Sequence, residues 1–510
     1  MKKIMIAGGL VLSLIVAGAI VALVWTADRS TDPDPEPKRE PAAEEGSYPE
    51  ELEEFYTQEL DWEECDGDQC ATIAVPIDYD DPDGATTELS MRVVGDEDAE
   101  QHLFVNPGGP GGSAVDFAVS MSSDFGDDVL DEYAIVGVDP RGVGESSPLE
   151  CYDDAEFDTY VDADPTPDTP EEVTQYGELV TGMGEACEEN SGDLAAHVST
   201  VEAARDMDIA RALLGDEEFH WFGASYGTYL GATYAALFPE KVGRMVLDGA
   251  INPELGPVDS ALGQTTGFQR ALEAYIEDCV ADDDCPLGTD PAAAEQKLAA
   301  LLAQLDAQPM PTDDEDRPLT EGEAFFGVAL PLYVESAWPL LTSALQAAME
   351  DDGSGLQELS DLYFERADDG TYAGNMGQVI TAVNCLDDSE RPSPEEVAER
   401  LPEFEAVSPV FGRALGASAG GCSSWPFEAD AEELDFTAEG AAPILVLGTT
   451  RDPATPYEQA VELADLLSSG VLVTRDGDGH TAYTSGNSCV EDVVDAYLVD
   501  GTVPDEDPEC

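Results

Sequence analysis

The sequence predicts an α/β fold with a mostly parallel sheet, helices on both of its faces, and a helical cap inserted between two core strands. The first observation is that short apolar runs alternate with helical patterns as far as about residue 252. The second is a change in the spacing of apolar residues: residues 253–434 show helical runs and no comparable strand pattern. The third is that strand patterns resume at Ile444, so the helical segment interrupts one sheet.

The sheet is expected to begin with two antiparallel strands and to continue with parallel ones. Apolar patterns at residues 71–76 and 87–94 flank the turn Asp81-Pro-Asp-Gly84, which is typical of a β-hairpin. An amphipathic helix is expected over residues 200–214, and a last helix over residues 489–498 closes the core. Further strands are expected at residues 102–106, 133–138, 218–222, 245–249, 444–448 and 470–474.

The inserted segment is expected to be a helical cap over the carboxyl edge of the sheet. Its helical runs are residues 267–278, 291–307, 337–350, 355–367 and 394–404. The resulting division of the chain is a signal peptide or signal anchor (1–27), a polar linker (28–48), a first core part (49–252), the cap (253–434) and a second core part (435–510).

The N-terminus predicts export. Met1-Lys2-Lys3 precedes an uncharged apolar run, residues 4–25, which is longer than an ordinary signal-peptide core and close to the ~20 residues that span a bilayer. The lysines are expected to stay in the cytoplasm. We favour an uncleaved anchor for membrane attachment over cleavage at Ala17-Gly-Ala19, so the protein is expected to be extracellular, either secreted or anchored to the outer face of the cytoplasmic membrane.

Charge is the unusual bulk property. The 111 acidic residues against 20 basic ones give a net charge of −91, and the acids are scattered along the chain. Such a surface repels phosphates, which excludes nucleic acid as a partner. We expect an anionic surface adapted to high salt, where screening weakens self-repulsion; an acidic pocket for cationic substrates is the alternative.

The ten cysteines form no C-x-x-C pair and no zinc-ligand spacing with histidine. With export expected, disulfides are the default use of these residues. Cys65 and Cys70, like Cys279 and Cys285, are near enough to join local loops. We therefore predict sequential pairing along the whole chain.

A nucleophile-elbow pattern, G-x-S-x-G, occupies Gly223 to Gly227. A short apolar strand leads into it and a run with helical spacing follows, and this strand, turn and helix are the setting that the elbow requires. The glycines allow a sharp turn that exposes the Ser225 hydroxyl. We therefore predict Ser225 as a catalytic nucleophile.

Two further residues complete a Ser–His–Asp triad in the prediction. His480 lies in a flexible loop after the last strand, whereas His102 and His220 begin or precede strands and are expected to be structural. Asp452 follows the penultimate strand, and Asp248 is the competing acid. The chain order Ser225, Asp452, His480 is the order expected of this fold.

The oxyanion is expected to bind backbone N–H groups. One donor is Tyr226, next after the nucleophile, and the other is Gly109, with Gly108 as the alternative, in the glycine-rich loop Asn106–Ser113. That loop lacks the Gly-Lys-Ser/Thr ending of a nucleotide loop. No metal or organic cofactor is expected.

Seven short motifs along the chain together point to one family. They are 106–113 (NPGGPGGS), 139–146 (DPRGVGES), 223–228 (GASYGT), 384–387 (NCLD), 422–426 (CSSWP), 451–456 (RDPATP) and 479–481 (GHT). Through them the chain resembles the α/β-hydrolase peptidases of the prolyl and tripeptidyl aminopeptidase type, especially the exported tripeptidyl aminopeptidases of actinobacteria. The resemblance covers roughly residues 60 to 510, and the extreme acidity and long apolar N-terminus depart from it.

The resemblance implies an α/β-hydrolase fold and a serine aminopeptidase that releases short peptides, tripeptides above all, from free N-termini. Its partners are then peptide or protein N-terminal substrates. Such an enzyme must hold the substrate ammonium, and the cap carboxylates Glu335, Asp387 and Asp388 are candidates by location.

Two other functions compete with this one. A carboxylesterase or lipase would use the same triad beneath a cap with an apolar acyl pocket. A surface binding protein could have kept the fold without the activity, although an intact triad argues against it. Epoxide hydrolases and dehalogenases are disfavoured because they place Asp at the elbow. The oligomeric state is left open.

Overall fold

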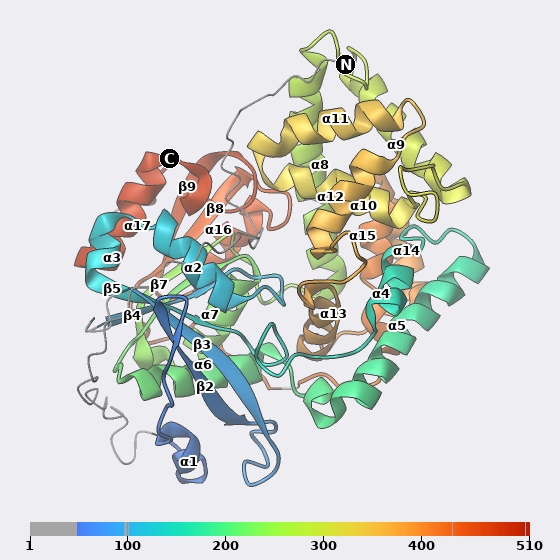
Figure 1. Ribbon diagram of the computed structural model, residues 1–510. Coiled ribbons are helices and arrows are strands. Elements are labelled where there is room, and N and C mark those ends of the chain that lie inside the picture. Colours follow the sequence, from blue (N-terminus) through green and yellow to red (C-terminus); the bar gives the residue numbers. More distant parts are fainter. Residues whose placement is uncertain (1–47, 96–98, 100, 431, 505) are drawn as a thin grey trace, which may run out of the picture.

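The computed structural model describes residues 48–95, 99, 101–430, 432–504 and 506–510. One nine-stranded sheet, in the order β1-β2-β3-β5-β4-β6-β7-β8-β9, forms the centre (Figure 1). The strands are β1 (Glu63–Cys65), β2 (Asp68–Pro76), β3 (Thr86–Val94), β4 (Gln101–Asn106), β5 (Tyr133–Val138), β6 (Phe219–Ala224), β7 (Val242–Asp248), β8 (Ile444–Arg451) and β9 (Gly470–Asp478).

The pairing confirms a mostly parallel sheet. β1, β2, β3 and β5 pair antiparallel at one edge, and every pair from β5 through β4 to β9 is parallel. The β2–β3 hairpin turns where Gly84 N–H donates to the Asp81 carbonyl at 2.8 Å. Strands buried on both faces explain the continuous apolar runs of the sequence.

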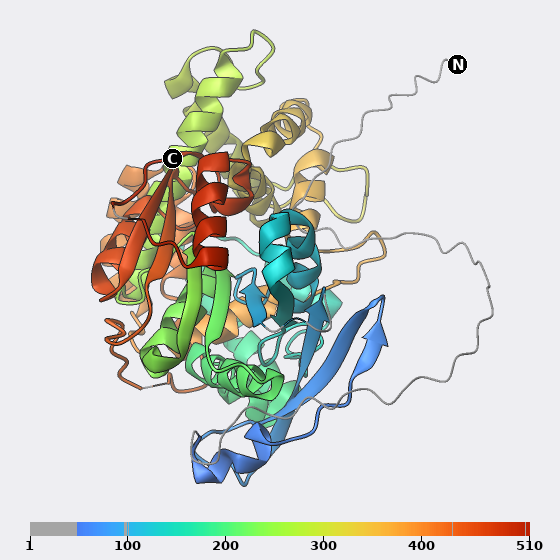
Figure 2. The same ribbon diagram turned by 90° about the vertical axis from the view of Figure 1, so that its left-hand side faces the viewer.

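Helices cover both faces of the sheet, and alternate residues of each strand point to the two layers. In β8, Ile444 and Val446 face the core that includes α6, α7 and α16, whereas Leu445 and Leu447 face the core that includes α2 and α17. The red C-terminal helix α17 lies in front of the parallel strands in Figure 2. The core helices are α1 (Glu53–Tyr56), α2 (Ala114–Asp124), α3 (Asp127–Glu132), α6 (Thr200–Leu214), α7 (Tyr226–Leu237), α16 (Tyr457–Leu466) and α17 (Ser488–Asp500).

Between β7 and β8 the chain is helical, and much of this segment packs around a separate apolar core. Trp338 and Leu341 of α11 and Leu356 of α12 lie in that core, each almost fully buried. The inserted helices are α8 (Pro257–Val280), α9 (Pro291–Ala307), α10 (Glu321–Ala329), α11 (Trp338–Ala348), α12 (Ser354–Phe364), α13 (Met376–Asp387), α14 (Pro394–Val407) and α15 (Gly412–Ser418).

A second stretch, between β5 and α6, joins the same side of the molecule. Helices α4 (Asp154–Val161) and α5 (Pro170–Ser191) lie beside α13 and α14 (Figure 1). In α5, Gly184 packs against Trp425 and Pro426, where a side chain would collide with the Pro426 ring. The sequence pattern did not indicate this association.

Five disulfides join the cysteines, and the sequential pairing predicted from spacing is confirmed. The pairs are Cys65–Cys70, Cys151–Cys187, Cys279–Cys285, Cys385–Cys422 and Cys489–Cys510.

The predicted apolar anchor, residues 4–25, and the predicted linker up to residue 47 lie outside the described residues. No helix in the described part of the chain is long and apolar enough to cross a membrane.

Candidate active site

Ser225 stands at a sharp turn between β6 and α7. Its backbone has φ 55° and ψ −123°, a region that costs a non-glycine residue conformational energy and is found at functional turns. Two hydrogen bonds hold the turn: Ser225 N–H donates to the Asp248 carbonyl at 2.8 Å, and the Trp221 indole donates to the Gly227 carbonyl at 3.0 Å. A side chain at Gly223 would collide with Gly227, so the flanking glycines are required. This geometry is the predicted elbow.

His480 and Asp452 meet at the carboxyl ends of β8 and β9. The His480 Nδ1 atom lies 2.9 Å and 3.0 Å from the two Asp452 carboxylate oxygens. The Asp452 side chain is fully buried, and it also accepts hydrogen bonds from the backbone N–H groups of Ala454, Thr455 and Thr481. The carboxylate is therefore fixed before any substrate arrives.

The Asp452 carboxylate makes the His480 ring more basic. Burial opposes a charged imidazole, but the Asp452 charge and hydrogen bond outweigh it and raise the pKa of His480 above its ordinary value. An imidazolium that forms here during a reaction is stabilised by its neighbour.

The loop after β7 brings this pair next to the elbow. Asp248 binds the Ser225 amide through its carbonyl, and the next residue is Gly249, with φ 70°. A Cβ atom built on Gly249 would lie 3.2 Å from His480 Cε1 and 3.1 Å from Thr455 Oγ1. The imidazole therefore lies against the segment that holds Ser225.

Asp248, the competing acid, has a different set of contacts. Its carboxylate accepts hydrogen bonds from the Ala482 and Tyr483 amides at 2.7 Å and 2.9 Å. Burial raises the pKa of Asp248 to about 6. The His480 ring nitrogen hydrogen-bonds to Asp452, and Asp248 anchors the loop that follows His480.

Thr455 is a contact that the sequence reasoning missed. Its hydroxyl lies 3.3 Å from His480 Nδ1, on the side of the ring where Asp452 also lies. A threonine three residues after a candidate acid is too common for its position to have signalled this contact.

The glycine-rich loop lies against the elbow. A Cβ atom on Gly108, which has φ 99°, would lie 2.8 Å from both Ser225 Cβ and Tyr226 N. The Gly108 N–H is already used, because it donates to the Asn106 side chain at 2.9 Å. Within the described residues, the N–H groups of Gly109 and of Tyr226, the first residue of α7, have no acceptor. These two donors are thus available to an oxyanion, whereas the Gly108 N–H is not; the oxyanion role of Gly109 and Tyr226 stays a prediction.

The cap touches both sides of this centre. The His480 amide donates to the Tyr333 carbonyl at 2.8 Å, and the two rings meet edge to face with centroids 5.3 Å apart. On the other side, the start of α13 covers the glycine loop, since a Cβ atom on Gly111 would lie 2.8 Å from Met376 Cα. Substrate must therefore reach Ser225 past residues of the cap.

The three acids proposed for the substrate ammonium lie in two places. Glu335 is exposed in a short 3-10 helix (Glu335–Ala337), just after Tyr333. Asp387 ends α13 and accepts hydrogen bonds from the amide and hydroxyl of Thr200 at 2.7 Å and 2.6 Å. Burial raises the pKa of Asp387 to about 7 and that of Asp388 to about 6. Their role toward an ammonium stays a prediction.

A fourth acid, Glu365, was missed. It follows α12 in the left-handed region, with φ 57° and ψ 35°, which is unusual for a residue with a side chain. Among the described residues its half-buried carboxylate has no hydrogen-bond donor, and burial together with the Asp116 charge raises its pKa. A Cβ atom on Gly374, just before α13, would lie 2.7 Å from this carboxylate. No sequence motif singles this glutamate out among so many.

Known proteins similar to this chain share nearly all of its length. Residues 408–510 match the family described as TAP-like protein. Serine protease Hip1 of Mycobacterium tuberculosis is 36% identical over 458 residues, and the match covers 87% of both chains. Carboxylesterase B of the same species is 38% identical, covering 87% of this chain and 86% of that protein. Tripeptidyl aminopeptidase of Streptomyces lividans is 32% identical, covering 88% and 86%.

These matches cover 87–88% of this chain, and they agree with the elbow, the buried Asp–His pair and the parallel sheet described above. The chain belongs to the α/β-hydrolase serine hydrolases of the tripeptidyl-aminopeptidase type.

Proposed function

We propose that this protein is a serine peptidase that releases short peptides, tripeptides above all, from free N-termini through an acyl-enzyme on Ser225. One observation carries the proposal: Ser225 stands on a strained elbow beside a buried His480–Asp452 pair. Relatives named serine protease and tripeptidyl aminopeptidase support peptides as the substrate class.

In this mechanism His480 acts as the general base. Its Nδ1 is held by Asp452, so Nε2 remains to take the Ser225 proton as the hydroxyl attacks the carbonyl carbon. The imidazolium then gives this proton to the leaving amine, the scissile C–N bond breaks, and the peptide remains as an ester on Ser225. Water repeats the sequence and releases the peptide as a carboxylate.

Two backbone amides stabilise the oxyanion. The N–H groups of Gly109 and Tyr226 have no acceptor among the described residues, so no internal hydrogen bond has to break when the charge forms. Tyr226 also begins α7, and the helix dipole adds positive potential at this end.

We propose Glu365 as a further ligand of the substrate ammonium, beside the earlier candidates Glu335, Asp387 and Asp388. A contact path supports it: Gly108 touches Ser225, Gly111 of the same loop touches Met376, and Gly374 before that helix touches Glu365. A bound cation stabilises a half-buried carboxylate that accepts no hydrogen bond more than it stabilises a carboxylate that is already paired. A tripeptide spans roughly 10 Å when extended, so an ammonium clamp set back from Ser225 selects for length.

A panel of chromogenic amides tests this function. Mono-, di-, tri- and tetrapeptide amides are compared, and the tripeptide is also used with its N-terminus acetylated. The expected result is the highest kcat/KM for the free tripeptide. If the acetylated substrate is cleaved as fast as the free one, the enzyme is not an aminopeptidase.

The Glu365→Gln variant separates the ammonium site from the chemistry. The variant is expected to raise KM for the free tripeptide roughly tenfold or more, which is the effect of losing one charged hydrogen bond. KM for the acetylated substrate should not change. Glu358→Gln, which alters an exposed acid on α12, the helix just before Glu365, is the matched control. Equal kinetics in both variants would remove Glu365 from the site while leaving the triad proposal intact.

A carboxylesterase is the second candidate, because a relative named Carboxylesterase B is 38% identical. The same panel decides between the two when short acyl esters are added to it. A kcat/KM that favours apolar esters over every peptide amide would assign the esterase activity instead.

We also propose that the protein is exported. Five disulfides support this, since such bonds persist in oxidising compartments. Expression with residues 1–27 in place, followed by cell fractionation, tests it; a product retained in the cytoplasm with free thiols would contradict export.

A further inference from the structure

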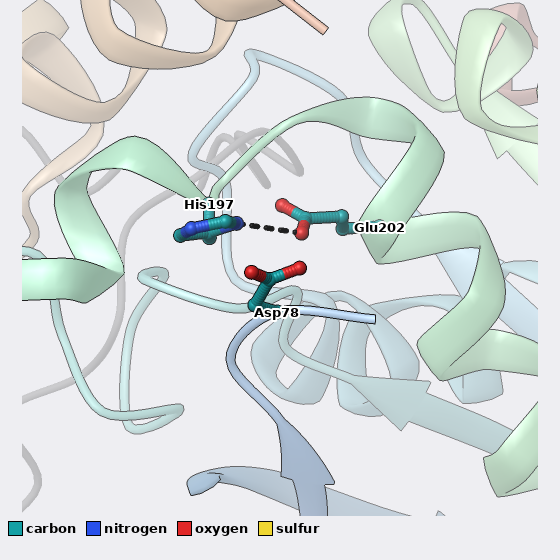
Figure 3. Close-up of side chains that lie close together, drawn as sticks. All are labelled: Asp78, His197 and Glu202. Atoms are coloured by element: carbon teal, nitrogen blue, oxygen red, sulfur yellow. Dashed lines mark hydrogen bonds and ion pairs between the residues drawn. The ribbon is translucent and has the colours of Figure 1, made fainter. Parts of the chain in front are cut away.

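Three metal-ligating side chains converge away from the active site. Asp78 lies in the loop after β2, His197 precedes α6, and Glu202 lies in the first turn of α6 (Figure 3). One donor atom from each lies within 4.8 Å of the others. His197 Nδ1 is 2.9 Å from Glu202 Oε1.

A buried arginine fixes the backbone that carries two of these ligands. The Arg141 guanidinium donates to the carbonyls of Ile77 and His197 at 2.7 Å and 2.9 Å. Ile77 directly precedes Asp78. The two loops are therefore held together independently of any contact among the three ligand side chains, and the cluster is organised in advance.

The arginine beside the cluster is already paired with another carboxylate. The guanidinium is paired with Asp206 by two hydrogen bonds, at 2.8 Å and 2.7 Å. Its contact with Glu202 is longer, at 3.5 Å. Asp78 and Glu202 bring two further carboxylates close to this pair, and a divalent cation bound between them would offset their charge.

We propose that Asp78, His197 and Glu202 form a binding site for one divalent metal ion of the zinc class. One imidazole nitrogen and two carboxylates are a mixed N/O set, which suits Zn²⁺ better than Ca²⁺ or Mg²⁺. Bonds of about 2.0–2.2 Å require small shifts of the three donor atoms, and the half-buried side chains of Asp78 and His197 have room to make them. His197 is 28% exposed, so water completes the coordination.

The ion has a structural role in this account. It ties the loop after β2 to the start of α6 at the sheet's antiparallel side, and none of its ligands belongs to the catalytic centre. Binding to the folded chain alone raises the unfolding temperature, and the free energy of stabilisation grows with the logarithm of the ion concentration divided by its Kd.

The test is Zn²⁺ binding to the full chain, stripped with EDTA, in molar NaCl with excess Mg²⁺ to suppress association with the acidic surface. One Zn²⁺ per chain and a higher Tm are expected. Asp78→Asn and His197→Gln should each weaken Zn²⁺ binding at least tenfold, the usual cost of losing a ligand or its support. In Zn²⁺-soaked crystals an anomalous peak should lie between the three side chains.

Asp164→Asn is the matched control. It alters the grouping Asp164, Asp306 and Glu321, which has three carboxylates and no histidine, and should leave Zn²⁺ affinity unchanged. Asp78→Asn retains the His197–Glu202 contact, so it tests the site even if the histidine variant folds poorly. Wild-type protein that binds no Zn²⁺ in molar salt, or equal affinity in Asp78→Asn and the control, would overturn the proposal. Tripeptide amide hydrolysis by Asp78→Asn should match the wild type, which separates this site from the proposed function.

Discussion

Asp387 binds Thr200 with both carboxylate oxygens, at 2.7 Å to the amide and 2.6 Å to the hydroxyl. The contact joins the end of α13 to the start of α6, and the Thr200 hydroxyl also lies 2.6 Å from the Tyr226 hydroxyl. A cap residue is thereby connected, through one threonine, to the residue that follows the nucleophile.

This buried carboxyl predicts a loss of stability as the pH rises. Burial raises the pKa of Asp387 to about 7, against about 4 in an unfolded chain. The free energy of unfolding that this carboxyl contributes is fully present below pH ~4 and is lost as the pH rises through 7. The reason is that the folded state binds the proton more tightly than the unfolded state, so removing the proton destabilises the fold. Asp387→Asn cannot titrate, so its urea midpoint should fall less between pH 5 and pH 8. Asp193→Asn, an exposed control, should follow the wild type. Identical pH profiles for Asp387→Asn and wild type would contradict the assignment.

Asp452→Asn should lower kcat by about 10³–10⁴-fold, because an amide no longer fixes the His480 tautomer or stabilises the imidazolium. The wild-type kcat/KM should rise with pH through a His480 pKa above its ordinary value, and the Asn variant should move this limb to lower pH. Circular dichroism checks that the fold is kept, and Asp465→Asn, at an exposed position of α16, is the control. Near-normal kcat in Asp452→Asn would exclude Asp452 from the triad.

Gly108→Ala should abolish most activity in a folded protein. The added methyl would lie 2.6 Å from the Ala224 carbonyl and 2.8 Å from Tyr226 N, at a φ of 99° that alanine rarely adopts. The loop must move, and the oxyanion donor of Gly109 moves with it, so kcat is expected to fall at least about 100-fold. Gly177→Ala in α5 is the control, because its added methyl group would have no atom within 4 Å. It should stabilise the fold by about 0.5–1 kcal/mol. Full activity in Gly108→Ala would place the oxyanion hole elsewhere.

Salt should stabilise this protein strongly. A net charge of −91 repels itself within the folded chain, and molar salt shortens the screening length to about 3 Å. The free energy of unfolding, measured in urea, should therefore rise between dilute buffer and molar NaCl. Equal stability in the two buffers would show that the acidic surface is not an adaptation to salt.

The features of the fold and of the candidate site that could be predicted from the sequence are set by residues close together in the chain. The elbow at Ser225 rests on glycines within two positions, and Cys65 pairs with Cys70 only five positions away. Asp452 directly follows β8 and His480 is the second residue after β9, so the parallel sheet brings them to one edge. Their catalytic roles stay predictions.

The features that could not be predicted from the sequence depend on packing between segments that are distant in the chain. Helices α4 and α5 join the cap side through contacts such as Gly184 with Trp425, which no periodicity encodes. Glu365 and Glu202 are indistinguishable by sequence among 111 acids, and only their surroundings in the fold separate them.

The central claim is a tripeptidyl ester on Ser225, and mass spectrometry of the trapped intermediate tests it most directly. The enzyme is mixed with an activated ester of a free tripeptide, quenched in acid and digested. We expect the mass of one tripeptidyl group on the peptide that contains Ser225, and far less of it with the N-acetylated ester. An unmodified Ser225, or a label on another residue, would contradict the account.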